Sequence, residues 1–522
     1  MDQQDKIAKS TGVVSSSIML SRILGLVREQ VFAYLFGAGL YTDAFVAAFR
    51  IPNLLRELFA EGVMATSFIP VFTDHLTNQG KDKAFHLANL MINLLLVVLS
   101  IIIIIGVFVS PFLAELIAPG FNQIPGKLEL TTHLAQIMFP FLLLVSLAAV
   151  AMGILHSFGH FATPALAPTL FNTGMIFSGF FICPLFDPPI IGMAIGALLG
   201  GFGQLIIQIP RVRKYGFSYK PVLNLSDPGV KRILLLMIPA IFGVASTQIN
   251  IFVTTHLASL LPQGSVSYLN YSYRLMQLPL GVFGVAVATV TLPAISLQVA
   301  QKEMKKVVST LCSSLKLVLY LVIPSSVFLI VGAEPIISVI YQYGKFTYLD
   351  TQATAYALVL YAFGLFTFAV VRVTAPIFYT LGDAKTPVKV SAISVVVNII
   401  LNLILMGPLG YKGLALANSL AGVVNMSLLL LFIDKKIGPL KRKDLTFSSF
   451  KYLLASLFMG VVIYSILYLF KLDLEIASLK QKISLLAGLL VSGFLSYLTA
   501  SLVLKVGELK RIFDILKIFK GK

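Results

Sequence analysis

The sequence has 522 residues, of which 57% are hydrophobic and 12% charged, and its mean hydropathy is +0.91. These values exclude an ordinary soluble globular protein and predict a chain whose solvent is the lipid bilayer. The formal net charge of +18 would suit a nucleic-acid partner, but basic loops in a membrane protein more often set its topology. The two cysteines, Cys183 and Cys312, are too few for a disulfide framework and lack metal-type spacing.

Apolar runs of about 20 residues recur along the chain, and each is long enough to cross a hydrocarbon core of roughly 30 Å as a helix. In chain order the predicted helices cover residues 12–36, 42–73, 86–116, 130–155, 161–184, 189–210, 233–259, 265–298, 308–336, 352–381, 386–407, 412–433, 450–470 and 483–505. The predicted fold is therefore an all-α polytopic membrane protein with fourteen transmembrane helices.

The lysines and arginines between these helices predict the orientation. With both ends of the chain in the cytoplasm, the inner connections and tails hold twenty-eight of them. The outer connections hold only six, namely Lys127, Lys345, Lys412, Lys471, Lys480 and Lys482. This asymmetry satisfies the positive-inside rule, accounts for most of the charge without a nucleic acid, and predicts an inner face that attracts anionic lipids.

An internal repeat divides the chain. The segment GILHSFGHFATP at 153–164 aligns without a gap to PIFYTLGDAKTP at 376–387, an offset of 223 residues, and two shorter matches lie at nearly the same offset. The repeat predicts two parallel six-helix lobes with the substrate path between them. We expect an N-lobe at 1–218, a C-lobe at 219–437, and helices 13 and 14 with a basic cytoplasmic tail at 438–522. The alternative is that the two segments share only Gly-x-x-x-Thr-Pro turn chemistry.

Some lysines toward the ends of the predicted helices are counted with the connections, and the six basic residues that remain inside the helices are all arginines. At mid-bilayer depth each arginine costs at least about 2.5 kcal/mol on insertion scales, which predicts a hydrated interior or specific partners. Guanidinium groups present fixed parallel donors that suit a diphosphate. The candidates for binding are Arg22, Arg28, Arg56 and Arg274, whereas Arg50 and Arg372 are the candidates for a structural role between helices.

Two other interpretations of the helical polar residues stay open. The arginines can instead pair with Glu29, Asp43, Glu57 and Glu61 to hold the helices together. Asn250, Asn398 and Asn402 can line a coupling-ion site, although interhelical hydrogen bonding is the favoured explanation. No pattern for metal catalysis or for another catalytic site is present in the sequence.

Several long blocks of sequence are similar to one known family. They are SRILGLVRE at 21–29, GAGLYTDAFVAAFRIPNLLRELFAEG at 37–62, APGF at 118–121, PALAPTLFN at 164–172, YRLMQLPLGVFGVA at 273–286, QYGKFT at 342–347 and DAKTPVK at 383–389. With these blocks the chain resembles the MurJ (MviN) family of lipid II flippases, within the multidrug, oligosaccharidyl-lipid and polysaccharide exporter superfamily.

The resemblance implies a two-lobed fold around a cationic cavity, with helices 13 and 14 forming a groove for an undecaprenyl tail. It implies movement of lipid II from the cytoplasmic to the periplasmic leaflet of the bacterial inner membrane by alternating access, driven by membrane potential, Na⁺ or H⁺ and without a cofactor. The family's cavity arginines correspond to Arg22, Arg28, Arg56 and Arg274, and its functional acid to Asp43. Glu57, Arg50 and Gln277 are further gating or ion-pairing candidates, Gln277 standing where some relatives have glutamate.

Four alternatives to lipid II flipping remain. A flippase for another polyprenyl-diphosphate sugar would share the arginines, and an exporter of cationic drugs would need carboxylates instead. A membrane glycosyltransferase would need acidic metal-binding pairs or a large polar loop, so a transporter is favoured over an enzyme. A scaffold that recruits cell-wall enzymes without transport is the fourth, and cell-wall synthesis and division proteins are candidate partners.

Overall fold

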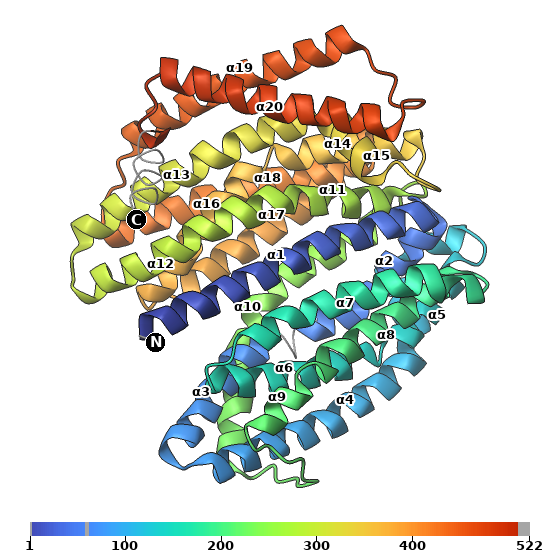
Figure 1. The fold of residues 1–522 in the computed structure, drawn as a ribbon, viewed down its shortest axis with the longest axis vertical. Helices are drawn as coiled ribbons and strands as arrows, with labels where there is room; N and C mark the ends of the chain where they lie inside the picture. The colour runs from blue at the N-terminus through green and yellow to red at the C-terminus, as the bar shows by residue number, and fades with distance from the viewer. Residues whose placement is uncertain (1–2, 58–61, 510–522) are drawn as a thin grey trace. The chain divides into compact units, whose positions relative to one another are not determined.

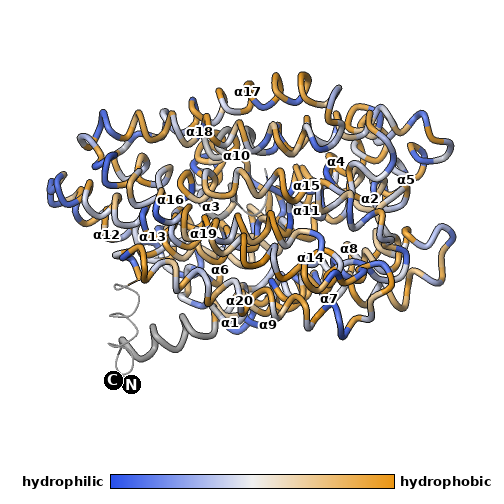
Figure 2. The backbone as a smooth tube through the Cα atoms, turned by 90° about the horizontal axis from the view of Figure 1, so that it is seen from above, coloured by the Kyte–Doolittle hydropathy of each residue, from blue (hydrophilic) through white to orange (hydrophobic). Residues whose placement is uncertain are grey.

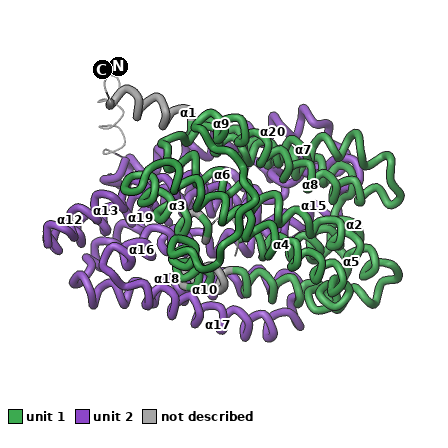
Figure 3. The backbone as a smooth tube through the Cα atoms, turned by 90° about the horizontal axis from the view of Figure 1, so that it is seen from below, with its two compact units in different colours: residues 1–267 green, residues 268–522 purple. Residues whose placement is uncertain are grey.

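The computed structural model describes residues 3–57 and 62–509, and these residues form helices and connections with no β-strand (Figure 1). They divide into two compact units, residues 1–267 and 268–522 (Figure 3). Helix formation follows from the composition, because a chain in a bilayer must satisfy its backbone hydrogen bonds internally. Figure 2 shows hydrophobic residues along the helices and hydrophilic ones gathered toward the helix ends.

Unit 1 contains ten α-helices and the start of an eleventh. They are α1 (Gln3–Phe36), α2 (Leu40–Arg56), α3 (Gly62–Asn78), α4 (Lys81–Ile117), α5 (Lys127–Met138), α6 (Phe141–Ser157), α7 (Ala162–Phe181), α8 (Ile190–Ile206), α9 (Ile209–Lys214) and α10 (Pro228–Ser259), with short 3₁₀ turns η2 (Pro119–Gln123) and η3 (Cys183–Leu185). Helix α7 packs against α1 and α8, and α10 packs against α3 and α4.

Helix α11 (Ser265–Pro279) crosses from unit 1 into unit 2 and continues through a π-helical turn, η4 (Leu280–Gly284). The remaining helices of unit 2 are α12 (Val285–Ala300), α13 (Met304–Val331), α14 (Ala333–Tyr341), α15 (Tyr348–Ala362), α16 (Leu365–Thr380), α17 (Lys385–Leu409), α18 (Tyr411–Ile437), α19 (Arg442–Phe470) and α20 (Leu479–Val503). Helices α17 and α18 run side by side, and α19 packs against both α13 and α20.

Helix α4 illustrates why these helices belong in a membrane. Its buried side carries Leu95 and Leu99 and then the small residues Gly106, Ser110 and Ala114. Its opposite side exposes a stripe of large apolar residues at helical spacing, comprising Ile101, Ile104, Ile105, Phe108 and Phe112. A helix that is apolar on both sides, with small residues at its packed face, is typical of a membrane span.

Nine spans in the described part of the chain are long and apolar enough to cross a membrane, and the pair α15 and α16, bent by 46°, makes a tenth. The chain is therefore a multi-pass, all-helical membrane protein, while the count of fourteen spans stays a prediction. The predicted helix at 42–73 corresponds to α2 and α3, on either side of residues 58–61, which lie outside the described chain.

The helix boundaries repeat at the offset seen in the sequence. Helix α6 ends at Ser157 and α16 at Thr380, α7 begins at Ala162 and α17 at Lys385, and α4 begins at Lys81 and α13 at Met304, each pair 223 residues apart. The compact units meet at residue 267, later than the predicted end of the N-lobe at 218, because α10 packs within unit 1. The predicted lobe boundaries concern the repeat and stay predictions.

Candidate functional site

All six arginines that were predicted inside helices lie on helices. Arg22 and Arg28 are on α1 and Arg50 and Arg56 on α2, in unit 1, whereas Arg274 is on α11 and Arg372 on α16, in unit 2. The side chains of Arg22, Arg274 and Arg372 are exposed, and those of Arg28, Arg50 and Arg56 are partly buried. Unit 1 therefore holds three of the four predicted binding arginines, and Arg274 belongs to unit 2.

Arg28 is held by an acid and an aromatic ring. Its Nη2 lies 2.5 Å from Oε1 of Glu29, and both side chains are about nine-tenths buried, with 13% and 10% exposed. Its guanidinium carbon lies 5.5 Å from the ring centroid of Phe171 on α7, a cation–π contact. Phe171 belongs to the PALAPTLFN block, and the sequence analysis did not single it out.

Glu57 connects the end of α2 with α10. Its carboxylate lies 3.8 Å from Arg56 Nη2 and accepts a hydrogen bond from the side-chain amide of Gln248. The expected pairing of arginines with acids is thus present for Arg28 and Arg56, while Glu61 lies outside the described residues. Between Arg22 and Glu57 the chain carries four arginines and three acids, and the third acid, Asp43, has a different partner.

Asp43 is completely buried and joins three parts of unit 1. Its Oδ2 lies 2.8 Å from Lys127 Nζ at the start of α5 and accepts the amide of Gly264 at 2.8 Å, while its Oδ1 accepts the amide and hydroxyl of Ser267 at 2.9 and 2.5 Å. A carboxylate at the N-terminus of a helix satisfies amides that have no partner within the helix and favours the helix dipole. Asp43 is therefore both an ion-pair partner and the cap of α11.

Lys127 completes this cluster, and the sequence analysis missed it. It was counted among the outer-loop lysines, yet its side chain is 1% exposed and its Nζ lies 4.0 Å from the ring centroid of Phe121 in η2. Next to that ring, Gly120 lies so close to α10 that a Cβ atom would stand 2.0 Å from the carbonyl oxygen of Ser259. The APGF block at 118–121, which precedes Lys127, was the available signal.

The asparagines predicted for a coupling ion lie in both units. Asn398 and Asn402 on α17 are buried, and Asn402 Nδ2 donates to Asn398 Oδ1 at 2.7 Å. In the described chain, Asn398 Nδ2 and Asn402 Oδ1 have no hydrogen-bond partner, whereas Asn250 is on α10 in unit 1. The pair therefore leaves one amide oxygen, Asn402 Oδ1, available as a ligand. Among the described residues, no group of three or more Asp, Glu, His or Cys side chains is placed to bind a metal ion.

Gln277 is engaged on its own helix, because its Nε2 donates to the hydroxyl of Tyr273 at 2.8 Å. The distance of one helical turn between the two residues explains this contact. Its predicted gating role, like that of Arg50, stays a prediction.

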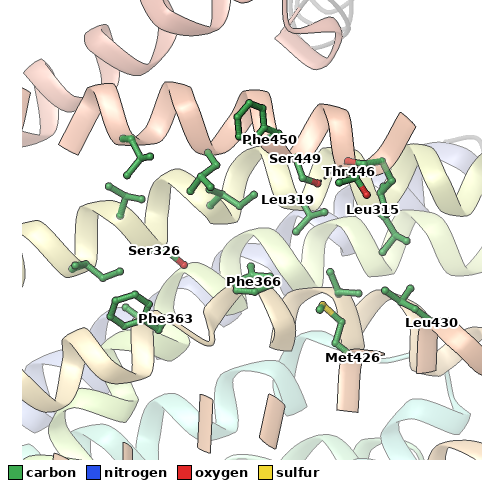
Figure 4. Close-up of a pocket in the computed structure, with 18 of the residues that line it drawn as sticks. Leu315, Leu319, Ser326, Phe363, Phe366, Met426, Leu430, Thr446, Ser449 and Phe450 are labelled. Carbon is green, nitrogen blue, oxygen red and sulfur yellow. Dashed lines mark hydrogen bonds between the residues drawn. The ribbon is translucent and has the colours of Figure 1, made fainter. Parts of the chain in front are cut away.

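Unit 2 has an apolar cavity of about 680 Å³ between α13, α16, α18 and α19 (Figure 4). Phe363 and Phe366 line it from the bend between α15 and α16, and Phe450 lines it from α19. Its few hydroxyl side chains are Ser326, Thr446 and Ser449. A cavity with this lining suits a hydrocarbon chain and offers little to a charged group.

A family model described as lipid II flippase MurJ matches residues 32–483. A probable lipid II flippase MurJ from Vibrio cholerae is 37% identical over 513 residues, covering 96% of this chain and 97% of the relative. The lipid II flippase MurJ from Burkholderia cenocepacia is 34% identical over 427 residues, covering 81% and 83% of the two chains. The chain belongs to the MurJ family.

Solved structures agree with this assignment. A MurJ structure described as an inward closed conformation has a TM-score of 0.78 and 29% identity, covering 94% of this chain and 98% of that one. A multidrug resistance MATE transporter in an inward-facing conformation has a TM-score of 0.69 at 17% identity, which shows a shared fold alone. Asp43, Arg56 and Arg274 lie within the part matched by the MurJ model, whereas Arg22 and Arg28 precede it.

Proposed function

We propose that this protein is a flippase that moves lipid II from the cytoplasmic to the outer leaflet of the bacterial inner membrane by alternating access. The observation that carries the proposal is membership of the MurJ family over residues 32–483, together with arginines on membrane helices. In this proposal the chain spans the membrane fourteen times as two parallel six-helix lobes plus two further helices, with both termini in the cytoplasm. The distribution of lysines and arginines supports that orientation.

The proposed ligands of the lipid diphosphate are Arg22, Arg28, Arg56 and Arg274. Exposure of Arg22 and Arg274 supports this role, because an exposed guanidinium on a membrane helix can be reached by an anionic ligand. Arg28 and Arg56 already contact acids, so each would hold phosphate while its charge is partly balanced. The excess of arginines over acids favours an anionic substrate and disfavours a cationic drug.

The apolar cavity of unit 2 is the proposed site for part of the polyprenyl tail. Its lining on α13 runs from Leu315 to Val331, which are about 24 Å apart along the helix axis. That length exceeds one leaflet of roughly 15 Å, so it suits a long isoprenoid better than a single phospholipid chain.

Coupling to Na⁺, H⁺ or the membrane potential is part of the proposal. The buried pair Asn398 and Asn402 supports a hard-cation site, because the Oδ1 atom of Asn402 has no hydrogen-bond partner in the described chain. No cofactor is proposed, and cell-wall synthesis and division proteins are proposed as partners through the pathway they share with lipid II.

The proposal is tested by measuring surface-exposed lipid II in bacteria that are depleted of their own flippase and supplied with this protein. We expect wild type to restore exposure, Arg274→Ala to abolish it, and Arg213→Ala, which removes an exposed arginine of the short helix α9, to leave it intact at equal membrane levels. Failure of correctly inserted wild type would redirect the proposal to another polyprenyl-diphosphate sugar. Equal restoration by wild type and Arg274→Ala would remove Arg274 from substrate binding.

A further inference from the structure

Unit 2 has a second cavity, of about 290 Å³, where α14 begins and where α19 connects to α20. Unlike the apolar cavity, it is lined by charged and polar side chains, among them Glu334, Tyr348, Lys471 and Asp473. By the predicted orientation it lies at the outer side of the membrane. The proposed transport function gives it no role.

The acidic part of this cavity is built from two elements. Glu334 is in the first turn of α14, and its Oε1 accepts a hydrogen bond of 2.6 Å from the hydroxyl of Tyr348. Asp473 is in the connection after α19, and its Oδ1 accepts the amide of Glu475 at 2.9 Å. Both carboxylates keep further acceptor positions for a cationic donor.

The basic part is formed by two lysines. Lys471 directly follows α19 as its C-cap, lines the cavity, and has its ammonium 5.1 Å from the ring centroid of Tyr468. Lys482 is in the first turns of α20 and is 5% exposed, and no hydrogen bond or ion pair to its amine is present in the described chain. Leu485, three residues further on the same side of α20, lines the cavity, which places Lys482 beside it.

These four charged side chains do not neutralise one another. No ion pair joins Glu334 or Asp473 to Lys471 or Lys482 among the described residues. Glu334, Asp473 and Lys471 line the cavity, and Lys482 lies one helical turn before the lining residue Leu485. The side chain of Lys482 is 5% exposed and has no anionic partner in the described chain, so a phosphate at the cavity would give its ammonium one. The cavity thus presents separate anionic and cationic groups to whatever enters it.

Two further observations indicate a lipid. Val331 lines both the charged cavity and the apolar cavity, so polar and hydrocarbon surfaces meet at that residue. Next to Lys471, the side chains of Tyr468, Leu469 and Phe470 are exposed by 60%, 77% and 73%. Exposed aromatic residues at the end of a membrane helix are typical of the interface at which lipid headgroups lie.

We propose that this cavity binds the headgroup of an outer-leaflet phospholipid with a free primary amine, such as phosphatidylethanolamine. Its phosphate contacts Lys482 and Lys471, its ammonium donates to Glu334 and Asp473, and its acyl chains follow the apolar surface that begins at Val331. A diphosphate fits less well, because two carboxylates would oppose its charge. The volume lies at the lower end for small-ligand sites, which suits a headgroup and excludes a sugar-peptide.

The test is binding of defined lipids to the purified full-length protein, followed by native mass spectrometry and by thermal unfolding in detergent. The lipids are phosphatidylethanolamine, phosphatidylglycerol and phosphatidylcholine with identical chains. We expect phosphatidylethanolamine to bind at least about ten-fold more tightly than the other two, because glycerol lacks the cation and choline lacks the N–H donors. Glu334→Gln is expected to erase this preference.

Lys482→Met keeps the side-chain volume, removes the charge and is expected to lower the affinity for phosphatidylethanolamine at least about ten-fold. Lys480→Met, which alters an exposed lysine of the same helical turn, is the matched control and leaves binding unchanged. Without lipid, Lys482→Met is expected to melt at the same or a higher temperature than wild type, because Lys482 makes no ion pair in the described chain whose loss would destabilise the fold. Reduced binding is then distinguishable from misfolding.

Three results would overturn the proposal. They are equal binding of phosphatidylglycerol that survives Glu334→Gln, wild-type affinity in Lys482→Met, and the same loss in Lys480→Met as in Lys482→Met. The proposal does not depend on lipid II transport, so failure of the surface-exposure assay leaves it standing and failure here leaves the flippase proposal standing.

Discussion

The turn between α6 and α7 in unit 1 and the turn between α16 and α17 in unit 2 have the same backbone and different capping side chains. Gly159 and Gly382 have φ of 74° and 73°, and the amide of the next residue donates to a carbonyl five residues back at 2.8 Å in both turns. That next residue is His160 in unit 1, with Nε2 2.7 Å from Thr163 Oγ1, and Asp383 in unit 2, which accepts from Thr386. The two repeats therefore share the backbone conformation of this turn but differ in the side chain that caps the following helix.

The two units also differ in how deeply they bury their ion pairs. Unit 1 buries ion pairs inside its helix packing, as at Asp43 with Lys127 and at Arg28 with Glu29. Ion pairs of unit 2 in the described chain are partly exposed, as at Asp383 with Lys436, although unit 1 also has one exposed pair, Asp74 with Arg232. Removing one partner of a buried pair lowers the free energy of unfolding far more than removing one partner of an exposed pair, because the remaining buried charge cannot reach water. The two units should therefore respond differently to matched substitutions.

The largest expected difference is between Lys127→Met and Lys436→Met. Lys127→Met leaves the Asp43 carboxylate buried without its cation and should lower the free energy of unfolding by about 3–5 kcal/mol. Lys436→Met removes a partner that is 39% exposed and should cost about 0–1 kcal/mol. Denaturant titration in mixed micelles measures both values. Adding Asp43→Asn to Lys127→Met should recover part of the loss, and equal costs in the two units would contradict the comparison.

Glycine substitutions in the two turns should have a smaller effect on the free energy of unfolding, and they test whether the two turns share the same backbone. Gly159→Ala and Gly382→Ala place a side chain at positive φ with no atom within 4 Å of the new Cβ, so only backbone strain is added. Each should cost about 1–2 kcal/mol, and the two costs should agree. Gly488→Ala in α20, where the Cβ also meets no atom and φ is not positive, is the control and should not destabilise. A clear inequality between the two turns would show that their backbones are not equivalent.

The smallest expected effect is a difference between the two turns in how their stability depends on pH. Burial, and then the charge of Arg211, lowers the pKa of His160, so the unfolded turn binds the proton better and the folded turn loses stability as pH falls below about 6.5. Hydrogen bonds from Lys436 and Thr386 lower the pKa of Asp383, so its turn loses stability only as pH falls below about 4.

Hydrogen exchange at the amides of His160 and Asp383 measures this difference. Between pH 7.5 and 5.5, after correction for intrinsic rates, protection should fall at His160 and stay constant at Asp383. His160→Gln should remove the dependence in unit 1. A parallel fall at both turns would indicate global opening rather than titration of His160.

The helices could be predicted from the sequence because apolar runs and backbone satisfaction leave few alternatives, and the repeat was visible in twelve aligned residues. The role of Lys127 could not be predicted. In the sequence, a lysine at the start of a helix after a turn is expected to be exposed to solvent. The burial of Lys127 depends instead on Asp43, 84 residues earlier, and on the close approach of Gly120 to α10. Lys482 was assigned to an outer loop for the same reason. The packing of α10 in unit 1 also depends on contacts that periodicity does not encode.

Helix α11 begins beneath the Asp43 carboxylate and carries Arg274 nine residues after Ser265. At 1.5 Å per residue, Arg274 is about 13 Å from that anchored start. If α11 tilts by about 10° about this fixed N-terminal end, Arg274 moves sideways by roughly 2 Å. If Arg274 binds the diphosphate as proposed, a displacement of this size exchanges a direct hydrogen bond for one bridged by water without breaking the helix.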